Sequence, residues 1–310
     1  MRTDEPLRVA LPLGIGDCHW SCQKLQGLRQ LHPDRPLHAY ISSSRWHDSV
    51  EYLKLVPFVD AAFRSDDAPY ALAQQLPPHH QDPRWSTLEG CANWNGFDYV
   101  IQANGHLETG GRIETFLPTV ATQYTYELQI PEEESAKARA LVGDGAVLLY
   151  LSGVGPNLGF HMNRFTPAAW VEIILRLNKE GVRPTILGAP TSQDRDYAAI
   201  VLGTAQKLGL QFRDLVGDTT IPMVCDIMRR ASVWMGLNSG LGIVSAMMGT
   251  PTVMFWSDSA FPIPGVTPLH TNMRTSWLAP WQLERYRTFS YGDPSLSLAN
   301  VVGTLFEVRR

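Results

Sequence analysis

The sequence predicts an α/β protein built from two doubly wound domains, each a parallel sheet covered by helices. Three observations predict this fold class. The chain has 310 residues, which suits two domains of roughly 150 residues each. Short apolar runs of strand length alternate with longer segments of helical periodicity. Two such series meet near residues 131–145, and strands joined through helices form parallel sheets with right-handed crossovers.

The first half carries the first series of elements. We expect a strand at Leu7–Leu11, a helix marked by Trp20, Leu25, Leu28 and Leu31 that ends before Pro33, a strand at Leu37–Ile41, a helix at Trp46–Leu55 and a strand at Asp98–Ala103. Residues 66–96 are rich in Pro, Gln, His and Asn, so they are expected to form an irregular loop.

The second half is more regular. We expect strands at Ala146–Leu151, Arg183–Leu187, Val233–Gly236 and Thr252–Trp256, and helices at Pro167–Lys179, Ser192–Leu208, Leu241–Met248 and Ser295–Val308, with a further helix that begins near Pro222. Ser295 is the expected N-cap of the final helix.

Composition excludes two broad classes. With 44% hydrophobic and 18% charged residues, the chain is not a disordered protein. A formal net charge of −4 removes the simplest argument for a nucleic-acid binder, which would be a strongly basic surface, although a local basic groove stays open.

Apolar runs and cysteines indicate the cellular setting. The longest apolar runs are of strand length, far short of the about 20 residues of a transmembrane helix, and no apolar signal-peptide core follows the first residues. Four scattered cysteines indicate a reducing compartment rather than a disulfide framework. We therefore expect a cytoplasmic protein, a setting that includes the inner face of a membrane. Cys18 and Cys22 lie one helical turn apart without a second pair, so we read them as buried helix residues and expect no metal site.

Ligands of open parallel sheets bind beyond the carboxyl ends of the strands, so the loops there are the candidate sites. In residues 233–242, a buried strand stops, a small polar loop turns, and a helix of small residues begins. The free backbone N–H groups of such a helix start, with the positive end of its dipole, bind phosphate. Ser239 can add a hydroxyl donor, and Gly240 permits close backbone approach. The alternative is a plain turn in which Asn238 and Ser239 cap the helix.

A second loop, residues 152–159, also follows a buried strand. Arg164 lies downstream, at the mouth of the next helix. It could bring a fixed positive charge to the same phosphates, or it could be solvated or paired with Glu172. The sequence alone leaves these alternatives open.

A third loop, residues 14–17, reads Gly-Ile-Gly-Asp. The third glycine of a dinucleotide fingerprint is replaced by His19, so that reading fails. What remains is a tight glycine turn that presents the Asp17 carboxylate at a helix start. Asp17 is either an N-cap or a general base within reach of a hydroxyl proton.

A fourth loop begins after the 98–103 strand. Asn104, Glu108 and Arg112 gather polar groups suited to sugar hydroxyls. His106 could serve as an acid or a base, or it could be structural or simply exposed.

These segments together resemble family 9 glycosyltransferases, the ADP-heptose lipopolysaccharide heptosyltransferases and their relatives. The Gly-Asp loop at 14–17 is similar to the family's N-terminal loop. The similarity is dense over residues 214–257, where relatives carry a Gly-x-Thr-x-Leu-Pro turn, a helix, a strand, Asn-Asp-Ser-Gly and then Gly-Thr-Pro. Here residues 217–222 read Gly-Asp-Thr-Thr-Ile-Pro, residues 237–240 read Leu-Asn-Ser-Gly, and residues 249–251 read Gly-Thr-Pro. Arg164 stands where relatives place a Lys.

The resemblance implies the GT-B fold, two Rossmann-like domains facing a central cleft. Residues 1–140 would form an acceptor-binding domain and residues 141–290 a donor-binding domain, and a helix in residues 291–310 would return to the first. It further implies an inverting enzyme that needs no metal or other cofactor. Such an enzyme moves a heptose, or another hexose or pentose, from a nucleotide-diphosphate sugar to a hydroxyl of a glycan or glycolipid.

Residue roles follow from the same resemblance. Asp17 would be the base that deprotonates the acceptor. The donor would be bound by Ser152, Gly153, Arg164, Thr219, Thr220, Ile221, Asn238, Ser239, Gly240 and Leu241, with residues 219–221 bordering the nucleoside. The acceptor would be bound by Gly16, Asn104, His106, Glu108 and Arg112.

Two departures from the family pattern lie in the phosphate loop. The family's Asp is Asn238 here, and a His common in relatives is Ile243. An amide cannot act as a base, and an isoleucine cannot donate a hydrogen bond. Two alternatives therefore stay open: a non-catalytic nucleotide- or glycan-binding protein, and a glycosyltransferase that acts on a modified DNA base.

Overall fold

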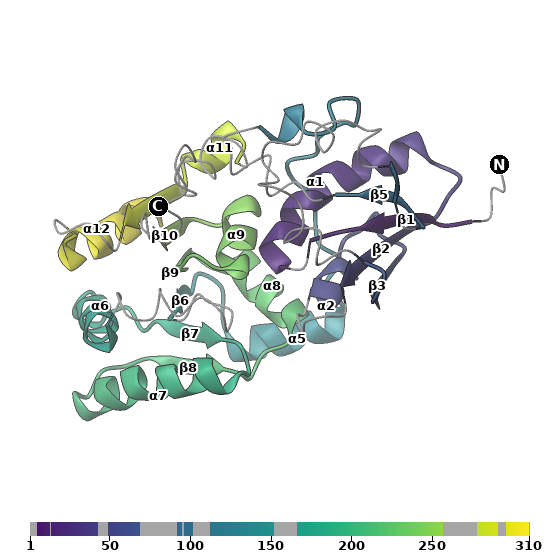
Figure 1. Cartoon of the computed structure of the whole chain (residues 1–310). Helices are drawn as coiled ribbons and strands as arrows, with labels where there is room; N and C mark the ends of the chain where they lie inside the picture. The colour runs from purple at the N-terminus through teal and green to yellow at the C-terminus, as the bar shows by residue number, and fades with distance from the viewer. Residues whose placement is uncertain are drawn as a thin grey trace. The chain divides into compact units, whose positions relative to one another are not determined.

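A computed structural model of the chain describes residues 5–12, 14–42, 49–68, 92–94, 96–101, 112–151, 166–256, 278–290 and 296–309 (Figure 1). The chain divides into two compact units, residues 1–129 with 263–279 and residues 130–262 with 280–310. The division at residue 129 differs from the expected one at 140. The reason is that α5 (Glu132–Leu141) packs against α8 (Ile221–Arg230) of the second unit.

The first unit contains a sheet in the order β3-β2-β1-β5-β4. The strands are β1 (Leu7–Ala10), β2 (Leu37–Ser42), β3 (Ala61–Ser65), β4 (Ala92–Trp94) and β5 (Phe97–Val100). Four strands are parallel, whereas β4 pairs antiparallel with β5. Since β4 lies within residues 66–96, the expectation of loop throughout that segment is wrong at this point. Helices α1 (Ile15–Leu31) and α2 (Ser49–Leu53) and a 3-10 turn, η4 (Ile113–Thr115), complete the described elements.

Helix α1 is buried along most of its length and is held against the segment 117–121. Gly27 permits the approach, because a Cβ there would lie 2.5 Å from the backbone oxygen of Ala121. Lys24 is fully buried, and its Nζ donates to the carbonyl oxygens of Val120 at 2.9 Å and Leu117 at 3.4 Å. The helix ends at Leu31, ahead of Pro33, as the sequence predicts.

Two buried polar rings, His19 and Tyr52, and the half-buried ring of Tyr126 join α1 to its neighbours. His19 Nδ1 is hydrogen-bonded to the Tyr52 hydroxyl and lies 3.1 Å from the Tyr126 hydroxyl. The two hydroxyls are 2.9 Å apart, and Tyr126 also donates to the backbone oxygen of His19 at 3.1 Å. Burial disfavours the charged imidazole and lowers the pKa of His19 to about 3.

This shift makes the first unit acid-sensitive. The pKa of His19 is lower in the folded state than the about 6.5 of an unfolded chain, so the unfolded state takes up the proton first. The free energy of unfolding should fall by up to about 1.4 kcal/mol per pH unit as pH drops from about 6.5 toward 3. His19→Gln should therefore show a shallower pH dependence in urea denaturation at pH 7, 6 and 5. Tyr52→Phe keeps the imidazole and should keep the wild-type slope of unfolding free energy against pH. Equal slopes for His19→Gln and the wild type would contradict the assignment of this acid sensitivity to His19.

The second unit contains a six-stranded parallel sheet in the order β11-β10-β9-β6-β7-β8. Its elements are, in chain order, α5 (Glu132–Leu141), β6 (Val147–Tyr150), α6 (Pro167–Lys179), β7 (Thr185–Gly188), α7 (Ser192–Lys207), β8 (Arg213–Val216), α8 (Ile221–Arg230), β9 (Val233–Leu237), α9 (Gly240–Met247), β10 (Thr252–Trp256), α11 (Pro280–Leu283), β11 (Tyr286–Ser290) and α12 (Leu298–Val308). Both units are thus α/β with parallel strands, as the sequence predicts. No helix in the described ranges is both long and apolar enough to span a bilayer.

Helix α12 corrects one expectation. Its apolar residues Val301, Val302 and Leu305 are buried in the same core as Trp170 and Phe255, and the helix packs against α6, β9, β10 and β11. The structure therefore places its apolar face in the second unit, where the resemblance implied a return to the first. The N-cap residue is Ser297, whereas Ser295 was expected and lies outside the described residues.

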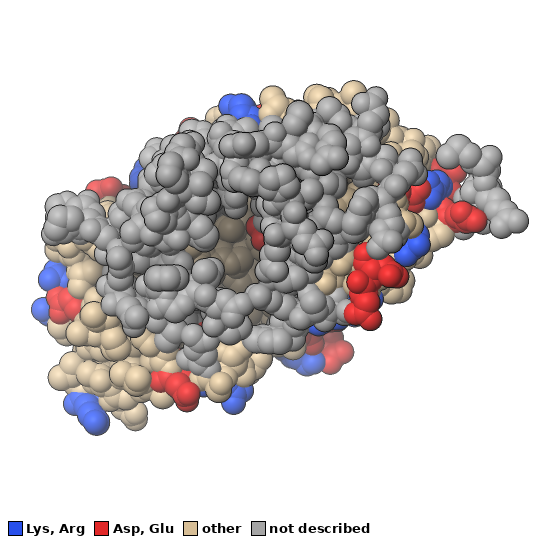
Figure 2. All heavy atoms as spheres, in the orientation of Figure 1, with Lys and Arg blue, Asp and Glu red and all other residues tan. Residues whose placement is uncertain are grey.

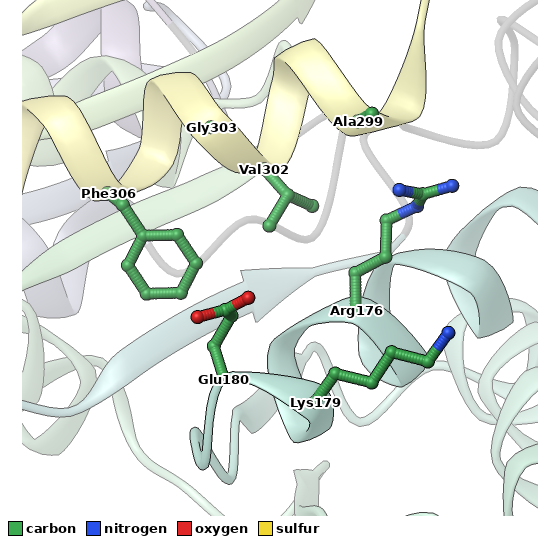
Figure 3. Close-up of a pocket in the computed structure, with 7 residues that line it drawn as sticks. All are labelled: Arg176, Lys179, Glu180, Ala299, Val302, Gly303 and Phe306. Atoms are coloured by element: carbon green, nitrogen blue, oxygen red, sulfur yellow. The ribbon is translucent and has the colours of Figure 1, made fainter.

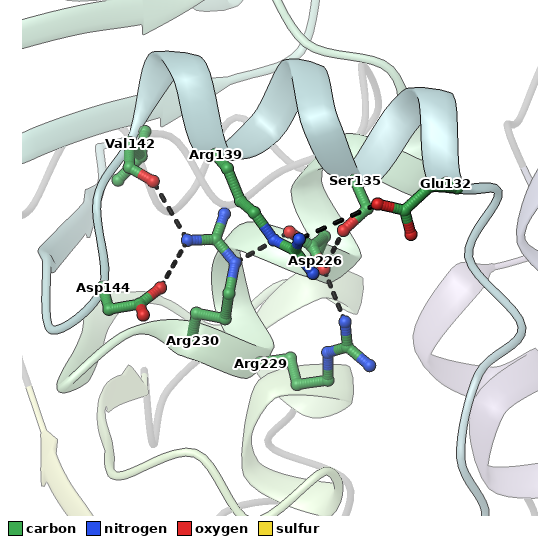
Figure 4. A network of polar contacts seen from close by, with 8 residues as sticks. All are labelled: Glu132, Ser135, Arg139, Val142, Asp144, Asp226, Arg229 and Arg230. Atoms are coloured by element: carbon green, nitrogen blue, oxygen red, sulfur yellow. Dashed lines mark hydrogen bonds and ion pairs between the residues drawn. The ribbon is translucent and has the colours of Figure 1, made fainter.

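A buried carboxylate ties α5 to α8 (Figure 4). Asp226 has no exposed surface, and its Oδ1 accepts from Ser135 Oγ at 3.1 Å and from Arg229 at 2.6 Å. Its Oδ2 accepts from Arg230 Nε at 2.8 Å. Arg230 donates onward to the exposed carboxylate of Asp144 at 2.7 Å. Burial alone would raise the pKa of Asp226, but the hydrogen bonds from the two arginines outweigh it and lower the pKa.

Candidate functional site

The turn between β9 and α9 has the geometry of an anion site. Ser239 is the N-cap of α9, and its Oγ accepts from the backbone N–H of Gly242 at 3.1 Å. The N–H groups of Gly240 and Leu241, in the first turn, then have no acceptor among the described residues. They lie at the positive end of the helix dipole and at the carboxyl end of a fully buried central strand. The chemistry available at this turn is the binding of an anion through backbone amides.

Two glycines bring this turn close to the sheet. A Cβ on Gly236 would lie 2.7 Å from Cη2 of Trp234 and 2.7 Å from the backbone oxygen of Tyr150. A Cβ on Gly242 would lie 2.6 Å from the same Cη2 and 2.8 Å from Cε of Met254. The edge of the Trp234 ring therefore fills the space where either side chain would begin.

Asn238 is not the helix cap, so the plain-turn alternative holds for Ser239 alone. The backbone N–H of Asn238 donates to the carbonyl of Phe255 at 2.9 Å, which fixes the end of β9 against β10. Its side-chain Oδ1 is buried and has no hydrogen-bond donor among the described residues. The Asn238 side chain thus contributes a buried acceptor rather than a charge.

The start of α8 forms a second polar turn at the same edge. Thr220 is the N-cap, and its Oγ1 accepts from the backbone N–H of Met223 at 3.3 Å and donates to the Glu134 carboxylate. Thr219 and Ile221 are half-buried beside it. Leu241 is likewise half-buried at the start of α9. The structure therefore puts these sequence-predicted donor residues in two turns, which follow β8 and β9 in one sheet.

An arginine that the sequence patterns do not single out lies between β7 and β8. Arg195 is exposed near the start of α7, and a Cβ on Gly217 would lie 2.7 Å from both its Nε and its Nη2. Nothing in the sequence marks it, since charged residues are common in the first turns of helices. The sequence feature that could have pointed to Arg195 is Gly217, which also adopts a left-handed conformation with φ of +79°.

Asp17 lies in the first unit, in the first turn of α1. Gly14 is the N-cap of that helix, so the interpretation of Asp17 as N-cap is wrong. The half-buried carboxylate folds back over the turn, and its Oδ2 is 2.8 Å from the position a Gly14 Cβ would take. The strand β1 ends at Ala10, and Asp17 therefore follows the carboxyl end of a central strand. Gly16 is buried next to it.

Arg112, an expected acceptor residue, is paired with a neighbouring acid. Its guanidinium donates to both carboxylate oxygens of Glu114, at 2.8 and 3.2 Å, and Tyr124 donates to the same carboxylate. The Arg112 hydrogen bonds lower the pKa of Glu114 to about 2. The remaining candidates lie outside the described residues: Ser152, Gly153, Arg164, Asn104, His106 and Glu108.

Other features of the described residues fall outside this site. A pocket of about 250 Å³ is lined by Arg176, Lys179 and Glu180 at the end of α6 and by residues of α12 (Figure 3). Since α6 begins after β6 ends, its last turn lies at the opposite edge of the sheet from the two turns above. No group of three or more potential metal ligands occurs among the residues that the structure describes. On the face in Figure 2, the described basic side chains occur singly or beside acidic ones.

Comparisons with known proteins identify the fold. No protein-family model matches the sequence, and neither does any curated protein. Solved structures do match: E. coli ADP-heptose LPS heptosyltransferase II aligns over 98% of both chains with a TM-score of 0.62 at 14% identity. The chain shares the heptosyltransferase fold.

Two further structures agree with this assignment. A family 9 glycosyl transferase from Veillonella parvula aligns over 98% of this chain and 97% of its own, with a TM-score of 0.65 and 12% identity. E. coli heptosyltransferase WaaC, solved with ADP, aligns over 98% of this chain and its entire length, with a TM-score of 0.58 and 13% identity. These alignments each cover 98% of the chain, and they confirm the GT-B fold class expected from the sequence.

Proposed function

We propose that the chain is an inverting glycosyltransferase. It moves a sugar from a nucleotide-diphosphate sugar to a hydroxyl of a glycan or glycolipid. The observation that carries the proposal is the β9–α9 turn, an anion-binding geometry at the carboxyl end of a central strand in a chain with the heptosyltransferase fold. One of the proteins that share the fold was solved with ADP, a nucleoside diphosphate.

In this proposal the start of α9 binds the diphosphate of the donor. Glycosyl transfer passes through an oxocarbenium-like transition state while negative charge grows on the departing diphosphate. The amides of Gly240 and Leu241 and the α9 dipole stabilise that charge. The proposal includes no divalent cation for this role. Ser152, Gly153 and Arg164 are proposed to contribute to the same diphosphate, and residues 219–221 to border the nucleoside.

Asp17 is the proposed general base. As the bond from the anomeric carbon to the diphosphate breaks, the acceptor oxygen forms a new bond to that carbon on the opposite face. The acceptor proton passes to the Asp17 carboxylate. We propose that Asn104, His106 and Glu108 hold the acceptor, together with Gly16 and Arg112.

A second candidate function is a nucleotide- or glycan-binding protein that does not catalyse transfer. The observation that favours it is Asn238, a half-buried and uncharged amide that stands where the family has an aspartate. This candidate keeps donor binding at α9 and loses the reaction.

The two candidates differ in whether donor is consumed. Purified protein is incubated with a panel of ADP-, GDP-, UDP- and CDP-sugars, with and without glycan acceptors, and released nucleoside diphosphate is measured. A glycosyltransferase releases one diphosphate per sugar transferred, and the release increases when the acceptor is present. Binding of a donor by calorimetry with no release across the panel would instead support the non-catalytic candidate. Absence of both binding and release would contradict the proposed diphosphate site.

A further inference from the structure

Arg195 is positioned by the turn that connects β7 to α7. The preceding residue, Asp194, is buried and accepts the backbone N–H of Ala189 at 2.8 Å, and Tyr150 donates to it at 3.5 Å. Thr191 caps the helix by accepting the N–H of Asp194 at 3.1 Å. Because Asp194 is held inward, the next side chain is directed to the surface at the carboxyl edge of the sheet.

The Arg195 guanidinium lies on the backbone of Gly217, directly after β8. Its Nε and Nη2 are each 2.7 Å from the place of a Gly217 Cβ, and its Cζ is 3.1 Å away, so any other residue there would displace it. The N–H of Gly217 donates to the carbonyl of Gly188 at 3.0 Å, which joins the ends of β7 and β8. The guanidinium therefore lies over the turn that leads to residues 219–221.

No acid neutralises this cation among the described residues. The structure gives Arg195 neither an ion pair nor a hydrogen bond from its side chain, whereas Arg176, Arg229 and Arg230 of the same unit are each paired with a carboxylate. A guanidinium offers five N–H donors and no acceptor. It is therefore suited to a ligand that presents acceptor oxygens at this edge.

The sheet order fixes which part of a donor could reach Arg195. In the sequence β9-β6-β7-β8, three strand spacings separate the β9–α9 turn from the end of β8, or about 14 Å. A diphosphate bound at the start of α9 is shorter than this separation, but a nucleoside attached to it extends along the strand ends. Arg195 would then contact the nucleoside and not the phosphates.

We propose that Arg195 recognises the nucleoside half of the donor, donating to an acceptor oxygen that is either a base carbonyl or a ribose hydroxyl. The inference rests on the proposed function, because it takes the diphosphate to bind at α9. Within that function it adds a specificity-determining residue on α7.

The test measures binding of ADP, GDP, UDP, CDP and inorganic pyrophosphate by calorimetry at 0.15 M salt. Arg195→Gln should bind the preferred nucleoside diphosphate about tenfold more weakly, the loss expected for one charge-assisted hydrogen bond. Pyrophosphate affinity should stay unchanged, since a charge at this separation is screened beyond the about 8 Å Debye length. Arg195→Lys keeps the positive charge but loses the planar guanidinium. Its affinity for the nucleoside diphosphate should therefore lie between those of the wild type and Arg195→Gln.

The matched control is Arg183→Gln. Arg183 is also exposed, donates to the backbone oxygen of Phe212 at 3.0 Å, and precedes β7 at the opposite edge of the sheet. Its replacement should change no affinity, and thermal melting checks that all variants fold. Comparison with 2′-deoxy and 3′-deoxy nucleoside diphosphates separates the two sources. If the partner is a ribose hydroxyl, the difference between wild type and Arg195→Gln disappears for the analogue that lacks it; if the partner is a base carbonyl, the difference persists in both analogues and occurs only with particular bases.

The failures are distinguishable. If the wild type binds nucleoside diphosphates and Arg195→Gln binds them equally well, the inference on Arg195 is overturned and the proposed function stands. If Arg195→Gln weakens pyrophosphate as much as nucleotide, Arg195 contacts phosphate and the inference is also overturned. If the wild type binds pyrophosphate but no nucleoside diphosphate, the proposed function fails and the inference with it.

Discussion

Asp17→Asn is expected to reduce glycosyl transfer by about 10²- to 10⁴-fold, the usual contribution of a positioned general base. The amide has nearly the shape of the carboxylate, so the first turn of α1 should form as before, but it cannot accept the acceptor proton. Donor affinity should be unchanged, because the proposed diphosphate site is the start of α9 in the second unit. Initial rates of nucleoside diphosphate release give the turnover, and calorimetry gives donor affinity.

The matched control for this prediction is Asp34→Asn. Asp34 is an exposed carboxylate just past the other end of α1, so its loss should leave turnover unchanged. Turnover within a few-fold of wild type for Asp17→Asn would remove Asp17 from the role of base. A parallel loss of donor affinity would point instead to a disturbed α1.

Asp226→Ala is expected to lower the free energy of unfolding by about 3–5 kcal/mol. The carboxylate is fully buried, and its removal leaves Arg229 and Arg230 without their shared partner. Urea denaturation of both proteins at pH 7 gives the difference. The effect falls on α5 and α8, which the network joins (Figure 4).

A control for Asp226 exists in the same network. Asp144 pairs with Arg230 at 2.7 Å, but its side chain is 83% exposed, so Asp144→Ala should lower the free energy of unfolding by about 0–1 kcal/mol.

The contribution of Asp226 should also depend on pH. The pKa of Asp226 is lowered on folding, so its contribution to stability is complete above the unfolded pKa of about 3.9 and is lost as pH falls through the folded value. The gap between wild type and Asp226→Ala should accordingly narrow in acid. Equal losses of unfolding free energy in Asp226→Ala and Asp144→Ala would contradict the larger contribution assigned to the buried carboxylate.

Elements with a buried apolar pattern could be predicted from the sequence. The expected bounds of α6 are those observed, because Thr166 caps the helix, Pro167 begins it, and its apolar residues recur at helical spacing. The missed strands β3, β8 and β11 are all edge strands of their sheets. An edge strand is partly exposed and needs no continuous apolar run, as Ala61–Ser65 illustrates with no fully buried residue.

Helix α5 was missed for a different reason. It buries only Ser135 and Ala138 between charged residues, so hydrophobic periodicity carries no signal for it. Its attachment includes the hydrogen bond from Ser135 to Asp226, a residue 91 positions further along the chain. The same limit applies to the site: Ser239 follows from the motif at 233–242, whereas Arg195 becomes visible only when the fold sets it against Gly217.

The glycines around the Trp234 ring constrain how this protein could be re-engineered, or could evolve, toward another donor. Positions 236 and 242 cannot gain a side chain without moving the ring or the sheet beneath it, so they are closed to variation. Asn238, Leu241 and Ile243 already carry side chains, are half-buried and border the same turn. A combinatorial library for new donor preferences would vary those three positions and keep glycine at 236 and 242. Two of these positions, 238 and 243, are also where the sequence departs from the family pattern.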